Sequence, residues 1–315
     1  MASPKSYWLA TRPFAFTASG IPSVMGSVMA LAMNSANPAF SFNWLTFALT
    51  VIGCMTVHAS CNMISDYFDY KTGLDTANNF GAMNVLVRRL LTERQLLTAA
   101  TITMIAALAI GGSLIGLVGP SVLWFVLFGA LSAVFYGSPP LNLKYVGLGD
   151  IQVILSFGTI MTLGAYYVQA HEFMDLSWGS PEVWKVVLYS LPSGLLIDAI
   201  LHANNHRDLY SDKAHGIKTM ATILGEKASQ SAQYVLVIGA YTFIIFMVVM
   251  RFMTPLMLVT LLTFPKALVV LKKVGGRNTL DPKSFNMMDV DAAQLHTAFG
   301  AAMIVAFVVS YFVKW

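Results

Sequence analysis

Long apolar stretches constrain the fold of this chain more than any other feature. Each has about the 20 residues that a helix needs to cross a bilayer, where a helix or a closed barrel is required to satisfy the backbone polar groups. Hydrophobic residues make up 57% of the sequence and charged residues 11%, about half the charged fraction of a soluble domain. We therefore predict an all-α integral membrane protein with nine transmembrane helices. The predicted spans are residues 14–33, 44–64, 95–117, 121–138, 150–170, 184–205, 230–250, 253–271 and 294–313.

The basic residues fall mainly on one side of this predicted topology. Loops after the even-numbered spans are long or basic, whereas those after the odd-numbered spans are short or acidic. All but three of the 19 lysines and arginines share the side of the N-terminus, the exceptions being Lys185, Arg251 and Lys314. Because loops rich in lysine and arginine stay in the cytoplasm, we predict a cytoplasmic N-terminus and cytoplasmic polar loops.

The second predicted span ends in a polar motif, NMISDYFDYKTGLD, over residues 62–75. Asn62, Asp66 and Asp69 follow one another at spacings of four and three residues, which places them within about 60° on one face of a helix. His58 extends this face one turn deeper, and Asp75 can fold back from the loop. An unpaired carboxylate is expensive to bury, so these acids are expected to face water or a cation.

A second acidic motif follows the sixth predicted span, in DAILHANNHRDLYSD over residues 198–212. Asp198, Asn205, Asp208 and Asp212 fall within about 80° of one another on a continuous helix. Asp198 lies within the span itself, where an acid indicates a functional site. The alternative for Asp198 is a structural pair with His202 one turn further on.

Both motifs have the chemistry of a magnesium site. Mg²⁺ binds oxygen ligands, often one or two carboxylates together with substrate phosphates. Two such motifs on one side of the membrane could hold Mg²⁺ and, through it, a diphosphate. A single motif of this kind would be read as a solvated helix end. Basic residues that could neutralise the remaining phosphate charge are Lys71, Arg88, Arg89, Lys144, Arg207 and Lys218.

Four stretches of the chain resemble the UbiA superfamily of intramembrane prenyltransferases. NMISDYFDYKTGLD and NNHRDLYSDKAHGIKTMATILG are similar to its two aspartate-rich motifs. TRPFAFTASGIPSVMGS resembles its Arg-Pro entry segment, and YGSPPLNLKYVGLGDI resembles its loop with a tyrosine and a lysine. The predicted topology is also that of the family. The resemblance implies a single prenyltransferase domain over residues 1–315, with nine helices around a central cavity.

Within the superfamily, the motifs are most similar to the MenA type, the 1,4-dihydroxy-2-naphthoate polyprenyltransferases, and to the animal UbiA-domain menaquinone-4 synthase. The 4-hydroxybenzoate branch more often has an aspartate directly after the asparagine of the first motif. Met63 occupies that position here. The resemblance therefore favours menaquinone biosynthesis over ubiquinone biosynthesis.

The resemblance also implies residue roles. Asp66, Asp69, Asp75, Asp208 and Asp212 would hold Mg²⁺ against a polyprenyl diphosphate, and Asn62 and Asn205 would orient the donor or a metal-bound water. Asp198 would act on the aromatic acceptor, a hydroquinone or naphthoate. Tyr136 and Lys144, with Lys71, Arg88, Arg207 and Lys218, would contact the substrates. The expected surroundings are membrane lipid, with the active site on the cytoplasmic side and no nucleic-acid partner.

Three alternatives remain open from the sequence. The acceptor could be 4-hydroxybenzoate or homogentisate. The chain could instead be a non-catalytic sensor of isoprenoid lipids, although a binder would have little need for two complete aspartate sets. It could also be a cation transporter, but acids in transporters lie near the bilayer midplane, and here they cluster at helix ends.

Overall fold

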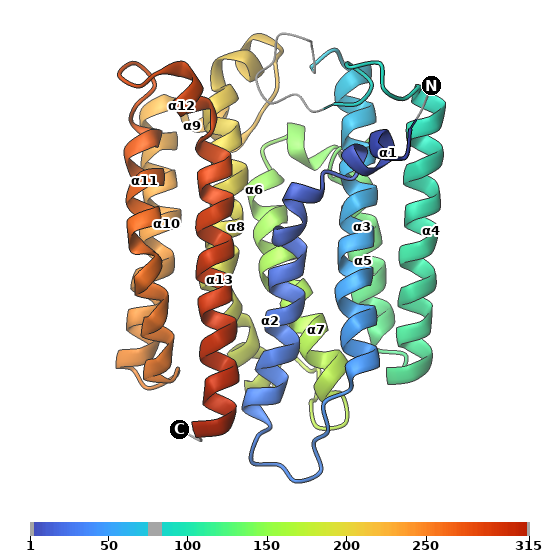
Figure 1. Cartoon of the computed structure of the whole chain (residues 1–315), viewed down its shortest axis with the longest axis vertical. Helices are drawn as coiled ribbons and strands as arrows, with labels where there is room; N and C mark the ends of the chain where they lie inside the picture. The colour runs from blue at the N-terminus through green and yellow to red at the C-terminus, as the bar shows by residue number, and fades with distance from the viewer. Residues whose placement is uncertain (1–2, 75–83, 314–315) are drawn as a thin grey trace.

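The computed structural model describes residues 3–74 and 84–313 and shows a bundle of long helices (Figure 1). The first half of the described chain contains α1 (Pro4–Ala10), η1 (Pro13–Phe16), α2 (Thr17–Met33), α3 (Trp44–Lys71), α4 (Glu93–Val118), α5 (Val122–Phe135), η2 (Leu143–Tyr145), α6 (Gly149–Val153), η3 (Ile154–Ile160) and α7 (Met161–Ala170). The second half contains α8 (Pro181–Ala214), α9 (Met220–Leu224), α10 (Glu226–Val249), η4 (Pro255–Thr263), α11 (Phe264–Val274), α12 (Pro282–Asn286) and α13 (Met288–Val313).

Eight helical stretches in the described residues are long and apolar enough to cross a membrane. They correspond to eight of the predicted spans, with the fifth built from α6, η3 and α7 and the eighth from η4 and α11. The remaining predicted span, 121–138, corresponds to α5, an apolar helix of 14 residues that is shorter than the usual spanning length. The chain is therefore a polytopic integral membrane protein.

Two of these helices continue well past the predicted spans. Helix α3 has 28 residues and α8 has 34, so each carries its whole aspartate motif in regular helix. The start of α3 is capped by Asn43, whose side-chain oxygen accepts from the backbone N–H groups of Leu45 and Thr46. Helix α8 begins at Pro181, a residue suited to the first helical position because its missing N–H would have no partner there.

The two motif helices end in the same way. Gly73 lies four residues after Asp69 and Gly216 lies four residues after Asp212, and each glycine has a φ of 72°. The next amide in each case donates back to the carbonyl of that aspartate, from Leu74 to Asp69 at 3.0 Å and from Ile217 to Asp212 at 2.9 Å. Glycine favours this left-handed conformation, and the resulting turn ends both helices just beyond their carboxylates.

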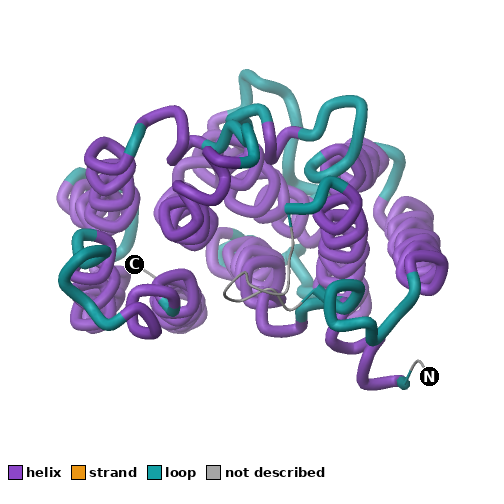
Figure 2. Tube along the Cα trace, turned by 90° about the horizontal axis from the view of Figure 1, so that it is seen from above, coloured by secondary structure: helices purple, strands orange, loops and turns teal. Residues whose placement is uncertain are grey.

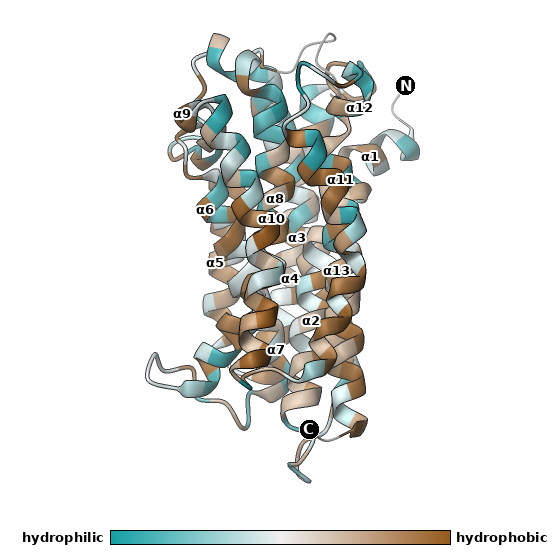
Figure 3. Cartoon of the chain, turned by 90° about the vertical axis from the view of Figure 1, so that its left-hand side faces the viewer, coloured by the Kyte–Doolittle hydropathy of each residue, from teal (hydrophilic) through white to brown (hydrophobic). Residues whose placement is uncertain are grey.

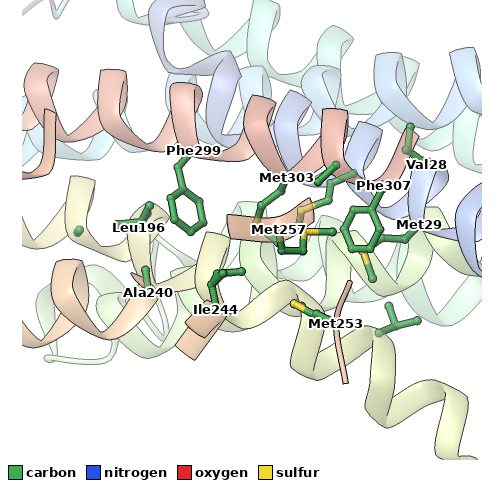
Figure 4. Close-up of a cluster of buried hydrophobic side chains, with 14 of the residues drawn as sticks. Val28, Met29, Leu196, Ala240, Ile244, Met253, Met257, Phe299, Met303 and Phe307 are labelled. Atoms are coloured by element: carbon green, nitrogen blue, oxygen red, sulfur yellow. The ribbon is translucent and has the colours of Figure 1, made fainter. Parts of the chain in front are cut away.

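The main hydrophobic core lies among α2, α8, α10, η4 and α13 (Figure 4). Figure 2 shows the helices of the bundle from above. Helices distant in sequence are neighbours, since α2 packs on both α7 and α13. Hydrophobic colour dominates the middle of the bundle, and polar colour gathers at the end that carries α1, α9 and α12 (Figure 3). Labelled core side chains are Val28, Met29, Leu196, Ala240, Ile244, Met253, Met257, Phe299, Met303 and Phe307.

Helices η3 and α8 make a very close contact through two glycines. A Cβ atom added to Gly158 would lie 2.7 Å from the Cα atom of Gly194, closer than real Cβ contacts. Glycine at both positions therefore lets the two backbones touch. This contact matters for the site because η3, a π-helix, and α8 form adjoining walls of the cavity described next.

Candidate active site

A cavity of about 1180 Å³ opens within the bundle. Its walls come from α2, α3, α4, α5, η3, α7, α8 and α13. Residues from both aspartate motifs line one part of it, and apolar side chains of α4, α5 and α7 line the rest. A cavity with a polar part and a long apolar part suits a ligand with a charged head and a hydrocarbon tail.

Asp69 of the first motif contacts two residues of one loop. Lys144 donates to Asp69 Oδ2 at 2.5 Å and also to Ser65 Oγ at 2.9 Å. The Tyr145 hydroxyl donates to the other carboxylate oxygen, Asp69 Oδ1. Asp69 is buried, whereas Lys144 keeps 22% of its side chain exposed. All four residues line the cavity, so a carboxylate, an ammonium and a phenol meet at its wall.

Asp66 and Asn62 tie the first motif to the entry segment of the chain. Arg12 forms an ion pair with Asp66 Oδ1, and Asn62 donates to the carbonyl of Thr11 at 3.0 Å. Arg12 lines the cavity and has a φ of 52°, although it precedes Pro13. A non-glycine residue in this region is strained, and such strain gathers at functional sites. The entry segment therefore places a guanidinium beside the first motif.

The second motif presents Asp208 and Asp212 to the same cavity. Arg207 binds Asp208 through two nitrogens, at 2.9 and 2.7 Å, and also binds Asp289 of α13 at 2.6 Å. Asp212 is buried and lies close enough to Asp208, Asp69 and Lys144 for their charges to interact. Carboxylates that are far apart in sequence thus meet at one site.

The loop between α5 and α6 joins the two motifs. Tyr145 and Lys144 of this loop contact Asp69, and the backbone amide of Lys218, just after the second motif, donates to the Tyr145 carbonyl at 3.2 Å. Tyr136, which follows the last residue of α5, also lines the cavity. Its phenol hydroxyl offers a hydrogen-bond donor there.

A buried polar cluster lies behind the second motif. His202 Nδ1 pairs with Asp150 Oδ1 at 2.9 Å, and Asn205 Nδ2 lies 3.5 Å from Asp150 Oδ2. Asp198 Oδ1 is buried with no hydrogen-bond partner in the described part of the chain, and Asp150 is the neighbouring charge. The alternative pairing of Asp198 with His202 is therefore wrong. Asp198 is not among the residues that line the cavity, and its contact with the acceptor stays a prediction.

Three predicted substrate contacts are not among the residues that line the cavity. Lys71 is half exposed and binds Glu93 at 2.7 Å, because α3 turns this side chain toward the start of α4. Arg88 and Lys218 are exposed, and neither lines the cavity. The roles predicted for these three residues stay predictions. Asp75, a predicted metal ligand, lies outside the described residues.

The structure also adds residues that the sequence did not single out for the site. Arg12 and Tyr145 bond to the first motif, Asp289 bonds Arg207, and Asp150 bonds the helix of the second motif. Arg12 belongs to the Arg-Pro segment, and Tyr145 and Asp150 belong to the loop motif already noted. These two motifs could therefore have pointed to Arg12, Tyr145 and Asp150 as site residues. No sequence motif pointed to Asp289.

The donor set fits Mg²⁺ in its chemistry. Asn62, Asp69, Asn205, Asp208 and Asp212 offer oxygen atoms to one part of the cavity. Among the described residues, no group of three or more His, Cys, Asp or Glu side chains is arranged to hold a metal by itself. This also suits Mg²⁺, which is commonly held by few carboxylates and completed by substrate phosphates.

Comparison with known proteins shows the family of this chain. The family described as "UbiA prenyltransferase family" matches residues 19–289. A UbiA prenyltransferase domain-containing protein 1 homolog of Drosophila melanogaster is 30% identical, over 96% of this chain and 79% of that protein. The 1,4-dihydroxy-2-naphthoate octaprenyltransferase of Bacillus subtilis (strain 168) is 26% identical, over 97% of this chain and 93% of that protein.

A solved structure shares the fold. A UbiA homolog from Archaeoglobus fulgidus bound to GPP and Mg²⁺ superposes with a TM-score of 0.64 at 15% identity, covering 95% of this chain and 99% of that one. The fold and site thus define an intramembrane enzyme with a deep apolar cavity. The chain belongs to the UbiA prenyltransferase family, and it is a prenyltransferase.

Proposed function

We propose that this enzyme transfers a polyprenyl group from a polyprenyl diphosphate to an aromatic quinone precursor, 1,4-dihydroxy-2-naphthoate or menadiol, in menaquinone biosynthesis. The naphthoate octaprenyltransferase among its relatives and the resemblance of its motifs to that branch support this acceptor class. We also propose that residues 1–315 form one catalytic domain, and that Mg²⁺ is the cofactor.

One observation carries the proposal: both aspartate motifs meet basic and phenolic side chains at the polar part of a single membrane cavity. Asp69 contacts Lys144 and Tyr145, and Asp212 lies near Asp69, Asp208 and Lys144. A diphosphate needs cationic and hydroxyl donors, and a polyprenyl chain needs an apolar channel. The cavity offers both, one beside the other.

In the proposed reaction, Lys144, Tyr145 and Arg12 donate to diphosphate oxygens, where negative charge grows as the bond breaks. Asp69, Asp208 and Asp212 would hold Mg²⁺, with Asn62 and Asn205 beside them; when bound, the cation supplies Lewis-acid stabilisation of the leaving diphosphate. Asp66, a predicted metal ligand that is not among the residues lining the cavity, orients Arg12 through their ion pair. The prenyl C1–O bond breaks, and its electron pair leaves with the diphosphate.

The aromatic ring then supplies the electron pair for the new carbon–carbon bond to prenyl C1. With dihydroxynaphthoate, the attacked carbon loses its carboxylate as carbon dioxide, and with menadiol it loses a proton. The apolar walls from α4, α5 and α7 exclude water that would otherwise capture the prenyl cation. We place this chemistry at the cytoplasmic side of the membrane, because most basic residues lie on that side of the predicted topology.

The test is a product-mass assay on purified protein in lipid nanodiscs. Geranylgeranyl diphosphate is supplied with Mg²⁺ or with EDTA, and dihydroxynaphthoate, menadiol, 4-hydroxybenzoate and homogentisate are supplied in parallel. We expect a prenylated naphthalenediol that forms with Mg²⁺ and not with EDTA. Prenylation of 4-hydroxybenzoate or homogentisate alone would overturn the acceptor class, and no prenylated product from any acceptor would overturn the proposed function.

A further inference from the structure

His58 lies in the cavity wall below the proposed diphosphate site. It is on α3, one turn before Asn62 and on the same side of the helix, and it lines the cavity although only 8% of the residue is exposed. A helix rises about 1.5 Å per residue, so His58 lies about 6 Å deeper than Asn62 along α3. At this depth, His58 lines the part of the cavity beyond the site proposed for the diphosphate group of the donor.

The hydrogen bonds around His58 define its tautomer. Ser19 Oγ lies 3.1 Å from His58 Nδ1 and 3.2 Å from the carbonyl oxygen of Phe16. A carbonyl can only accept, so the single hydroxyl hydrogen of Ser19 goes to Phe16. Ser19 Oγ therefore accepts from Nδ1–H, which leaves Nε2 without a hydrogen and able to accept a hydrogen bond. No described residue donates to Nε2.

Aromatic rings surround this imidazole. The Phe157 ring centroid is 4.8 Å from that of His58 at an interplanar angle of 65°, and Phe16 is 6.0 Å away at 62°. Phe157 also lines the cavity, and it lies on the π-helix η3, a kind of helix that is frequent at functional sites. One acceptor nitrogen among aromatic edges and faces is suited to a planar ring that carries a hydroxyl group.

We propose that His58 Nε2 accepts a hydrogen bond from a ring hydroxyl of the aromatic acceptor, and that Phe157 forms one wall of this acceptor subsite. The hydrogen bond pulls the hydroxyl hydrogen toward nitrogen and raises the electron density of the ring carbons that attack the prenyl group. This inference rests on the proposed function, because it assigns the place of the acceptor in that reaction.

The experiment measures ligand binding, so that it does not depend on turnover. Affinity for 1-hydroxy-2-naphthoate, a redox-stable acceptor analogue, and for geranylgeranyl thiolodiphosphate is measured in nanodiscs for wild type, His58→Ala and His58→Gln. His296→Ala is the matched control, because His296 is also a buried histidine bonded to a serine, Ser193 at 3.2 Å, but lines no part of the cavity. Folding is checked by the melting temperature of each variant.

We expect His58→Ala to weaken naphthoate binding by about 3-fold to 10-fold, as for loss of one hydrogen bond, with unchanged thiolodiphosphate binding. His58→Gln should recover part of the affinity through its amide oxygen, and His296→Ala should change neither ligand. Equal weakening for both ligands, or weakening of the thiolodiphosphate alone, would assign His58 to the prenyl chain and overturn the proposal. Unchanged naphthoate binding in both His58 variants would also overturn it.

The binding experiment distinguishes failure of the proposed acceptor subsite from failure of the proposed function. If wild-type protein forms prenylated naphthalenediol but His58→Ala binds the naphthoate normally, the reaction stands and the subsite is wrong. If wild-type protein binds no naphthoate at all, both the subsite and the acceptor class are wrong, whereas a product from another aromatic acceptor would still establish prenyl transfer.

Discussion

At the scale of single residues, the site is organised around Asp69. Its carboxylate is buried, yet it receives a lysine ammonium at 2.5 Å and a tyrosine hydroxyl, both from one loop. A buried carboxylate is tolerated when it is paired and hydrogen-bonded. Asp69 therefore holds Lys144 and Tyr145 beside the cavity. We propose that the same carboxylate also binds the Mg²⁺ cofactor.

Replacing Asp69 tests this arrangement. Asp69→Asn removes the charge but keeps the size, so Lys144 loses its counter-ion and the cavity loses one oxygen ligand of the proposed cofactor. We expect kcat to fall by about 100-fold or more, in the range seen when a transition-state contact is lost. Product formation by mass spectrometry measures it. Asp175→Asn, an exposed carboxylate that binds Ser177, is the control and should retain wild-type turnover. Near-normal turnover in Asp69→Asn would contradict the assignment.

The sequence predicted part of the site at this scale. Helical spacing alone places Asn62 and Asp69 on one face, and both line the cavity. The partners of that face could not be predicted from spacing, because Arg12 is 54 residues from Asp66 and Tyr145 is 76 residues from Asp69. Contacts of that range depend on how the helices pack, which a single sequence does not specify.

At the scale of elements, the two motif helices and η3 shape the cavity. Hydropathy predicted the membrane-spanning parts of α3 and α8, because each contains a long apolar stretch. It also predicted one helix over 150–170, where the structure has α6, the π-helix η3 and α7 in succession. A π-turn adds one residue per turn and leaves the apolar pattern nearly unchanged, so hydropathy alone could not reveal it.

The contact between η3 and α8 can be tested through its glycines. Gly158→Ala places a methyl group against the backbone of Gly194, where no flexible side chain can move aside. We expect a loss of about 1–3 kcal/mol in stability, the usual effect of overpacking, together with weaker naphthoate binding because Phe157 shifts. Thermal unfolding in detergent measures the first effect. Gly112→Ala, with open space around its Cβ, is the control. Equal melting temperatures for both variants would contradict the close contact.

At the scale of the whole molecule, polar loops and both aspartate motifs share one end of the bundle. The sequence predicted this arrangement from the distribution of lysine and arginine, and Figure 3 shows polar residues gathered at the end with α1, α9 and α12. The sequence predicted nine spans. In the described residues, eight of the corresponding helical stretches have 20 residues or more, whereas the ninth, α5, has only 14. Composition over a window does not show where a helix stops.

The proposed orientation predicts which positions are accessible from each side of the membrane. In a background with Cys54 and Cys61 replaced by alanine, Lys213→Cys at the motif end and Asp175→Cys in the opposite loop each supply one thiol. We expect a membrane-impermeant maleimide added to intact bacterial cells to label the Asp175 position and to spare the Lys213 position until the cells are opened. The reverse pattern would place the active site outside the cytoplasm.

The most direct measurement for the whole account is the affinity of geranylgeranyl thiolodiphosphate, with and without Mg²⁺, for wild type, Asp69→Asn and Asp212→Asn in nanodiscs. If the two motifs form one diphosphate site, Mg²⁺ should strengthen binding to the wild type, and each single variant should lose most of that gain. Wild-type, Mg²⁺-dependent affinity in either variant would show that the motifs do not act together and would contradict the account.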